Sequence, residues 1–194
     1  MTLRRREVVQ ALLADRGGLL VVAGLGSTAW DCTAAGDSPL TFPMWGAMGG
    51  AAMTGLGLAL AQPQRRVLVI TGDGEMLMGL GSLATIGVQK PANLTVVVID
   101  NERYGETGMQ ATHTAHGVDL AAMARAAGFA SGVLVRDGAG VAAVRRSVQQ
   151  DAGPHFAQIK VAAEKAPLAL PPREGALLKS RFREALLGKS AALQ

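Results

Sequence analysis

Two polar clusters in the sequence each follow an apolar run typical of a buried strand. The run at 66–71 leads into a Gly-Asp-Gly turn centred on Asp73, and the run at 94–99 leads into an Asp-Asn pair that contains Asn101. In an open parallel sheet, ligands bind beyond the carboxyl ends of the strands, so these two side chains can meet at one point. A carboxylate and an amide oxygen, together with backbone and phosphate oxygens, are the ligands that Mg²⁺ prefers. The spacing therefore predicts a magnesium site for a phosphate-containing ligand.

Glycines beside Asp73 fit this interpretation. Gly72 and Gly74 allow a tight turn and the close approach of a phosphate to free amides at the start of the following helix. Alone, the Gly-Asp-Gly segment could be a plain turn, and Asp100 with Asn101 could be a loop cap. The two clusters together, at this spacing, favour the binding site.

A second glycine-rich turn, Gly24-Leu25-Gly26-Ser27, ends the apolar run at 19–24. It suits a second set of phosphate-binding amides because a helix is predicted to follow. The alternative is a dinucleotide-binding fingerprint, but no acidic residue ends a second strand about 20 residues later, as that fingerprint requires.

These clusters need strands and helices that alternate along the chain. Apolar runs predict strands and periodic patterns predict helices, with a loop over 101–117. Strands that are apolar on both faces and alternate with helices predict an α/β fold, a doubly wound, mostly parallel sheet covered by helices. The predicted strands are 19–24, 66–71, 94–100, 131–136 and 155–161, and the predicted helices are 4–16, 27–35, 46–62, 77–89, 119–127 and 138–151.

The composition changes after Val161, where prolines separate the last strand from a final apolar pattern. We expect a binding domain over residues 1–163. Over 164–194 we expect a proline-containing linker followed by an amphipathic helix at 173–187. This helix is either an assembly element or a frayed tail.

The composition also excludes several classes of protein. Of the 194 residues, 49% are hydrophobic and 18% are charged, which excludes a disordered chain and favours burial of surface against a partner. The net charge of +4 comes from the two ends and aromatic residues make up only 4%, so we expect no nucleic-acid partner. Cys32 is the only cysteine, which excludes an internal disulfide and an iron–sulfur cluster and favours the reducing cytoplasm.

The charge-free stretch at 38–64 has two interpretations. It is long enough to span a bilayer, and Gly46 and Gly50 have GxxxG spacing. Thr54, several glycines and the strand-like segments on both sides instead favour a buried helix beneath another part of the assembly. We therefore expect no membrane association, and the N-terminus shows no signal-peptide pattern.

Three longer motifs carry a family resemblance: FPMWGAMGGAAMTGLGLAL, GDGEMLMGLGSLATI and DNERYGETGMQATHT. They resemble thiamine diphosphate-dependent enzymes, in particular the small β subunits of sulfopyruvate and phosphonopyruvate decarboxylases. The resemblance covers residues 4–163 and implies the C-terminal, diphosphate-binding domain of that family, with thiamine diphosphate and Mg²⁺ as cofactors. It implies that Asp73 and Asn101 ligate the metal and that Arg103 offers its backbone carbonyl.

The resemblance also implies which residues surround the cofactor. Gly46 matches the position whose carbonyl accepts a hydrogen bond from the aminopyrimidine. Met48 matches the apolar side chain that holds the cofactor bent, and its alternative role is a core methionine. Glu75 stands where many family members have serine or alanine. The candidate cofactor-binding residues are Gly26, Ser27, Gly46, Met48, Gly72, Asp73, Gly74, Glu75, Asn101, Arg103, Tyr104 and Gly105.

The segment after the metal ligand resembles the family's active-site loop. Glu106 and Thr107 are candidate catalytic residues that could reach the substrate. His113 is a third candidate, to bind an acidic substrate or move protons, and its alternative is an exposed loop histidine, as for His116.

In the resembling enzymes a glutamate from a separate pyrimidine-binding domain activates the cofactor. The predicted elements leave no room for that domain, so we expect it on a companion subunit, and we expect self-association as well. The expected function is the thiamine diphosphate- and Mg²⁺-binding subunit of a hetero-oligomeric decarboxylase (carboxy-lyase) for a 2-oxo acid such as sulfopyruvate or phosphonopyruvate. The alternatives are another thiamine diphosphate-dependent carboligase or lyase subunit, and a non-catalytic binding subunit with the same fold.

Overall fold

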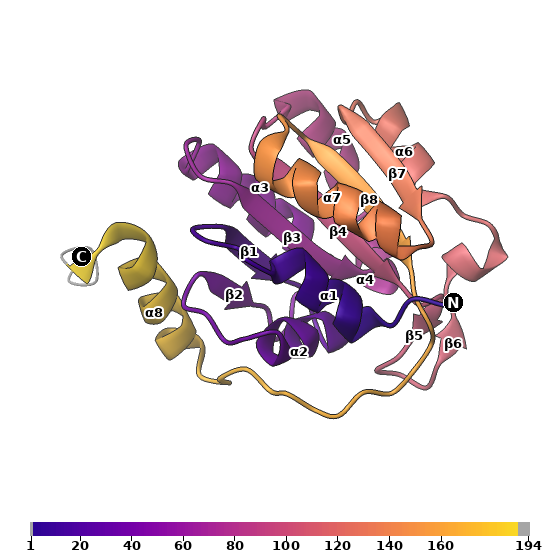
Figure 1. Cartoon of the computed structure of the whole chain (residues 1–194), viewed down its shortest axis with the longest axis horizontal. Coiled ribbons are helices and arrows are strands. Elements are labelled where there is room, and N and C mark those ends of the chain that lie inside the picture. Colours follow the sequence, from indigo (N-terminus) through magenta and orange to yellow (C-terminus); the bar gives the residue numbers. More distant parts are fainter. Residues whose placement is uncertain (1, 190–194) are drawn as a thin grey trace.

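The computed structural model describes residues 2–189. Six strands form one sheet in the order β2-β1-β3-β4-β8-β7, and every neighbouring pair is parallel (Figure 1). A two-stranded hairpin, β5-β6, follows β4. The predicted α/β fold with a parallel sheet covered by helices is confirmed. The strands are β1 (Leu20–Ala23), β2 (Thr41–Pro43), β3 (Val67–Gly72), β4 (Leu94–Asp100), β5 (Arg103–Tyr104), β6 (Gln110–Ala111), β7 (Ser131–Val135) and β8 (His155–Lys160).

Helices cover both faces of the sheet because the strands are apolar on both sides. The first, second and seventh α-helices pack on one face, and the third to sixth pack on the other. The helices are α1 (Arg5–Leu13), α2 (Ser27–Ala34), α3 (Ala51–Ala61), α4 (Asp73–Met78), α5 (Ser82–Gln89), α6 (Leu120–Ala126), α7 (Gly138–Gln150) and α8 (Gly175–Leu187), with a 3-10 turn η1 (His113–His116).

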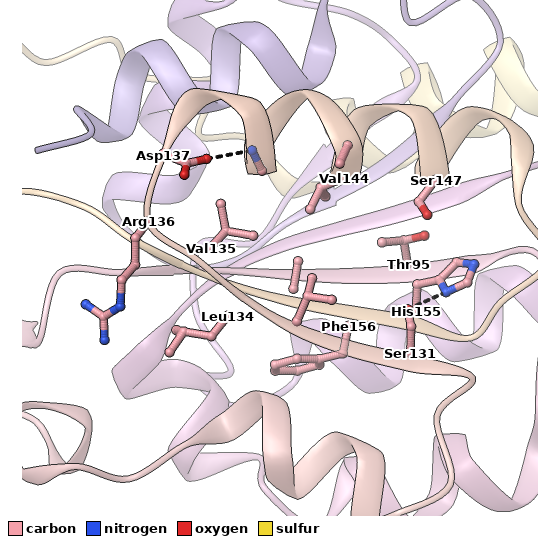
Figure 2. A pocket seen from close by; sticks show the side chains of 14 residues that line it. Thr95, Ser131, Leu134, Val135, Arg136, Asp137, Val144, Ser147, His155 and Phe156 are labelled. Carbon is pink, nitrogen blue, oxygen red and sulfur yellow. Dashed lines mark hydrogen bonds between the residues drawn. The ribbon is translucent and has the colours of Figure 1, made fainter. Parts of the chain in front are cut away.

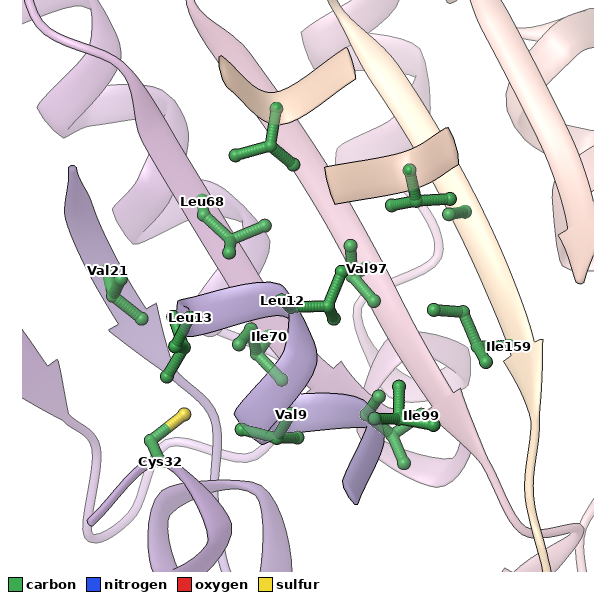
Figure 3. Close-up of a cluster of buried hydrophobic side chains, with 14 of the residues drawn as sticks. Val9, Leu12, Leu13, Val21, Cys32, Leu68, Ile70, Val97, Ile99 and Ile159 are labelled. Carbon is green, nitrogen blue, oxygen red and sulfur yellow. The ribbon is translucent and has the colours of Figure 1, made fainter. Parts of the chain in front are cut away.

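One half of the core lies beneath α1, α2 and α7. Figure 3 shows Val9 and Leu12 of α1 against strand residues that include Ile70 and Val97, all fully buried. Cys32 of α2 belongs to the same cluster, and burial raises the pKa of its thiol to about 12. Cys32 therefore behaves as a small apolar core residue.

The helix predicted over 46–62 starts later than expected. Residues 44–50 form a loop in which Ala47 and Gly49 have positive φ angles (55° and 93°), so α3 begins only at Ala51. One face of α3 packs on the sheet, while Met53 and Leu60 on the other are 42% and 50% exposed. The helix is thus buried on one side within this chain. Among residues 2–189, no helix has the length and apolarity that crossing a membrane requires.

The sequence analysis missed one element and was wrong about another. The charge-free stretch also contains the short strand β2, which pairs with β1. The predicted helix at 77–89 is replaced by α4 and α5, which a turn at 79–81 separates. The turn packs tightly, since a Cβ on Gly79 would lie 2.2 Å from the carbonyl oxygen of Gly49.

The predicted C-terminal helix forms as α8 and packs on the edge of the sheet at β2 (Figure 1). The ring of Phe182 lies 5.6 Å from that of Phe42, and Arg181 forms a bidentate ion pair with Asp37. The linker before it is also attached, because Trp45 Nε1 donates to a linker carbonyl at 2.8 Å. A role of α8 in assembly stays a prediction.

Candidate functional site

The sheet brings the predicted polar clusters together at its carboxyl edge. Gly72 pairs with Ile99 in the β3–β4 register, so the next residues, Asp73 and Asp100, lie side by side. The helix after β1 packs on one face of the sheet and those after β3 on the other. Such a change of direction between adjacent strands is where open α/β sheets bind their ligands.

A cavity of about 170 Å³ opens at this edge. It brings together most of the residues that the sequence predicted for the site. Gly26, Gly46 and His113 do not line it, and His113 is exposed on η1. The lining comprises the predicted residues Ser27, Met48, Gly72, Asp73, Gly74, Glu75, Asn101, Arg103, Tyr104, Gly105, Glu106 and Thr107, together with Arg5, Leu25 and Ile99.

Hydroxyl groups orient Asp73 from one side. Its Oδ2 accepts a hydrogen bond from Thr112 (2.5 Å), and the hydroxyl of Thr114, whose single proton is closer to Asp100, lies 3.3 Å from the same oxygen. Asp73 is 2% exposed. Burial raises the pKa of Asp73 to about 6, with the nearby Asp100 adding to the rise and the threonine bonds opposing it. Thr112 thus binds one of the two carboxylate oxygens of a residue that lines the cavity. A buried carboxylate with a raised pKa beside a cavity is typical of a functional site.

Asp100, beside Asp73, is fully buried. Its carboxylate accepts hydrogen bonds from Thr114 (2.7 Å) and Gln158 (2.6 Å) and pairs with Lys160 at 2.8 Å. Burial alone would lower the pKa of Lys160, but its bonds to Asp100 and Glu102 raise it. Thr114 therefore joins the candidate ligand Asp73 to a charged network that extends to β8.

The turn after β4 exposes oxygens towards the cavity. Asn101 Oδ1 accepts from the amide of Arg103 at 3.0 Å, an Asx turn that leaves a second lone pair on the same oxygen. The carbonyls of Glu102 and Tyr104 accept bonds from residues 112 and 109 across the β5–β6 hairpin. Because ladder bonds alternate along an antiparallel strand, the carbonyl of Arg103 between them points away from β6.

Glu75 connects the loops around the cavity. Its Oε2 accepts from Thr71 (2.7 Å) and from the amide of Leu25 (3.1 Å), and burial raises the pKa of its carboxyl although these bonds oppose the rise. Gly24 faces the same carboxylate so closely that an added Cβ would lie 1.9 Å from Oε2. Glu75 thus holds the turn after β1 against the turn after β3.

The ring of Tyr104 packs directly on Gly74, where a side chain would clash. An added Cβ would lie 2.5 Å from Tyr104 Cε1 and 3.6 Å from Met48 Cε. The chain therefore approaches the cavity there with backbone alone, flanked by an aromatic ring and a thioether. That arrangement suits a phosphate at the backbone and an apolar ring system above it.

The loop over 104–107 forms the opposite wall. Glu106 lies over the turn after β1, since a Cβ on Gly26 would be 2.9 Å from its Oε1. Gly26 has a φ of 73°, which favours glycine there. Thr107 Oγ1 hydrogen-bonds to Gln110 at 3.0 Å, and Glu106 and Thr107 are both exposed. Two acid–base or hydroxyl groups are thus available at the mouth of the cavity.

A larger cavity, of about 420 Å³, lies between α7 and strands β7 and β8 (Figure 2). Figure 2 shows Ser131 and His155 joined at one end of it and Asp137, which caps α7, at the other. The Ser131–His155 bond is 2.7 Å long, and burial lowers the pKa of His155. Most of the other lining side chains are aliphatic, so this cavity has fewer charged side chains than the smaller one.

The donor set of the smaller cavity fits a magnesium–diphosphate group. No cluster of three His, Cys, Asp or Glu side chains suited to a metal occurs in the described part of the chain. A cation beside Asp73 would therefore complete its shell with the Asn101 amide oxygen, the Arg103 carbonyl and ligand phosphates, which are the oxygen ligands of Mg²⁺.

Several residues around the cavity were missed by the sequence analysis. Thr112 and Thr114, just before and within η1, contact Asp73. Gln158 and Lys160 of β8 contact the neighbouring Asp100, and only the presence of polar residues within an otherwise apolar strand hinted at them. Arg5 had a clearer signal. It precedes Val8, Val9 and Leu12 at helical spacing and thus shares the buried face of α1.

Known proteins resemble this chain in sequence. A sulfopyruvate decarboxylase subunit beta from Methanothermobacter thermautotrophicus is 43% identical over 129 residues, which are 66% of this chain and 69% of the relative. A phosphonopyruvate decarboxylase from Streptomyces viridochromogenes is 46% identical over 109 residues, 56% of this chain but 27% of that longer protein.

Solved structures resemble it in fold. Benzoylformate decarboxylase from Polynucleobacter necessarius superposes with a TM-score of 0.72 at 20% identity, over 87% of this chain and 35% of that one. The family described as the thiamine pyrophosphate enzyme C-terminal binding domain matches residues 26–159, which contain Asp73, Asn101 and most of the cavity lining. The chain therefore belongs to the thiamine pyrophosphate enzymes and contains their C-terminal, cofactor-binding domain.

Proposed function

We propose that the cavity at β1, β3 and β4 binds thiamine diphosphate through Mg²⁺. Asp73, the Asn101 side chain and the Arg103 carbonyl would hold the metal, and the amides at the starts of α2 and α4 would hold the diphosphate. Met48 would support the cofactor rings. The observation that carries the proposal is Asp73 itself, a buried carboxylate that lines the cavity and that Thr112 holds through one of its two oxygens.

We propose decarboxylation of a 2-oxo acid with an acidic tail, such as sulfopyruvate or phosphonopyruvate. The names of the relatives support this reaction class. Thiamine diphosphate would supply the nucleophilic carbon and the electron sink. The chain would position it, and Glu106 and Thr107 are placed at the cavity mouth to contact the substrate or a proton in transit. His113, exposed on η1, is the more remote candidate.

We propose that the active site is completed by a companion subunit that carries a pyrimidine-binding domain and an activating glutamate. Several relatives are named as a beta subunit, which implies a companion. Large apolar side chains near the cavity mouth and on α3 support such a contact, because an exposed apolar patch commonly marks an interface. They are Trp45, Met48, Met53 and Leu60, each between 36% and 50% exposed.

Calorimetry of the full chain tests the cofactor site. Thiamine diphosphate and inorganic pyrophosphate are titrated with and without Mg²⁺ into the natural chain, Asp73→Asn and Asp137→Asn. Asp137→Asn is the matched control because Asp137 also begins a helix after a strand but lies at the other cavity. We expect Mg²⁺-dependent binding that Asp73→Asn abolishes and Asp137→Asn preserves. Equal affinities in all three proteins would refute the assignment.

A further inference from the structure

Arg5 is a buried cation at the edge of the proposed site. It is 4% exposed and lines the cavity together with Ser27 and Asn101. Its position follows from α1, which begins at the carboxyl edge of the sheet, where Leu3 O accepts a hydrogen bond from Ala162 N just beyond β8 (2.8 Å). The apolar face of α1 then carries Arg5 inward with Val8 and Val9.

The guanidinium of Arg5 is poorly satisfied. Its partner among residues 2–189 is Asp31, with Nη1 3.4 Å from Oδ2, and its buried Nε has no hydrogen-bond partner. Asp31 is also bound by Arg6 at 3.0 Å, so one carboxylate serves two guanidinium groups. A buried charge normally has close partners, and a guanidinium with unused donors can bind a further oxygen ligand.

The charged groups around the cavity indicate whether the ligand of Arg5 is an anion or a cation. Carboxylates of Asp73, Glu75 and Glu106 line it, and they would repel an anion unless cations compensate them. The guanidinium of Arg103 already donates to the Glu102 carbonyl at 2.8 Å. Arg5 is therefore the cation with the most unused donors at the cavity, and a guanidinium suits phosphate and other oxyanions.

We infer that Arg5 binds an oxyanion in the cavity, as a ligand-contacting residue supplied by the N-terminal helix. This inference rests on the proposed function, which provides two sources of that anion. One is the diphosphate of the cofactor, and the other is the acidic tail or carboxylate of the substrate.

The test compares Arg5→Gln with Arg6→Gln in the full chain. Arg6 is the matched control because it binds the same Asp31, donates to Pro167 O at 2.7 Å and does not line the cavity. Inorganic pyrophosphate with Mg²⁺ is titrated by calorimetry, and sulfopyruvate is then titrated into chain saturated with Mg²⁺ and thiamine diphosphate. For one of these probes, Arg5→Gln should weaken binding about tenfold or more, as for loss of a charge-assisted hydrogen bond, while Arg6→Gln should stay within about twofold.

The probe whose affinity changes in Arg5→Gln identifies the source of the oxyanion. Weaker pyrophosphate binding assigns the cofactor diphosphate, and a change confined to sulfopyruvate assigns the substrate. Because Arg5→Gln could destabilise the fold by leaving Asp31 short of a partner, Arg5→Gln/Asp31→Asn is measured as well; it should restore the melting temperature but not the affinity.

The failures are also distinguishable. Unchanged affinities for both probes in Arg5→Gln, in a chain that binds pyrophosphate in an Asp73-dependent manner, overturn the role of Arg5 and leave the proposed function standing. If the natural chain binds neither pyrophosphate nor thiamine diphosphate with Mg²⁺, the proposed function fails first and the role of Arg5 fails with it.

Discussion

The two cavities beside the sheet differ in what they enclose more than in size. The one along β7 and α7 is larger, about 420 Å³ against about 170 Å³, but its lining has one carboxylate, one guanidinium group and one serine–histidine pair among mostly apolar residues. The smaller one has three carboxylates and two guanidinium groups. Between β1 and β3, successive connections leave the sheet on opposite faces, which opens a crevice where polar strand ends converge. Topology, and not volume, thus distinguishes the candidate functional site.

The strongest test of this difference is to add one methyl group to the wall of each cavity. Gly74→Ala places a Cβ 2.5 Å from Tyr104, and Gly140→Ala places one 2.7 Å from Val135 Cγ1. Both glycines lie in the first turn of a helix after a strand. We expect each variant to lose about 1–3 kcal/mol of unfolding free energy through overpacking.

The two variants should separate in cofactor binding. Displacing Tyr104 disturbs the wall of the smaller cavity, so Gly74→Ala should weaken Mg²⁺–thiamine diphosphate binding about tenfold or more, whereas Gly140→Ala should leave it unchanged. Calorimetry on both proteins measures this. A loss of affinity in Gly140→Ala as large as in Gly74→Ala would remove the distinction between the cavities.

Removing one hydroxyl in each region tests a single contact in each cavity. Thr112→Val deletes the bonds to Asp73 and Thr114, and Ser131→Ala deletes the bond to His155. Because the first involves a buried carboxylate, chemical denaturation should show a loss of about 1–3 kcal/mol for Thr112→Val and about 0.5–1.5 kcal/mol for Ser131→Ala.

The metal affinity shows whether Thr112 also positions the candidate ligand. Mg²⁺-dependent pyrophosphate binding should weaken in Thr112→Val, recover in Thr112→Ser and remain unchanged in Ser131→Ala. If Thr112→Val binds as the natural chain does, the hydroxyl stabilises the fold without orienting Asp73.

Much of the smaller cavity could be predicted because its key residues come directly after apolar runs. Asp73 and Asn101 each end such a run, and parallel register then brings their strand ends together. Thr112 and Thr114 could not be found in this way, since their contacts depend on how the chain returns after the β5–β6 hairpin. Local spacing carries no information on that path.

The elements of the fold also divide into those that the sequence predicts and those that it does not. Long apolar runs predicted the central strands, whereas the short strand Thr41–Pro43 was hidden inside the charge-free stretch. The sequence pattern predicted helix at the glycines of 46–50 and 79–81. These segments instead form two turns that contact each other at Gly49 and Gly79. Tertiary contacts, and not local propensity, decide where these helices begin and end.

The smallest expected effect is a pair of opposite pH trends. The pKa of Asp73 is raised from 3.8 to about 6 by burial, so the native chain holds a proton there that the unfolded chain has released. This contribution to stability is present at low pH and is lost as the pH rises through about 6. The pKa of His155 is lowered from 6.5 by burial, so its contribution instead falls as the pH drops below 6.5.

Unfolding free energies at pH 5, 6 and 7 without Mg²⁺ measure both trends. The stability of the natural chain relative to Asp73→Asn should decrease by about 1 kcal/mol from pH 5 to pH 7, because this interval covers only the upper part of the range between the two pKa values. Relative to His155→Gln it should increase over the same interval, by less, because His155 is only half-buried. Added Mg²⁺ should reduce or reverse the first trend, since the ion favours ionised Asp73, and leave the second unchanged. A Mg²⁺ effect on the His155 trend alone would place the cation at the larger cavity.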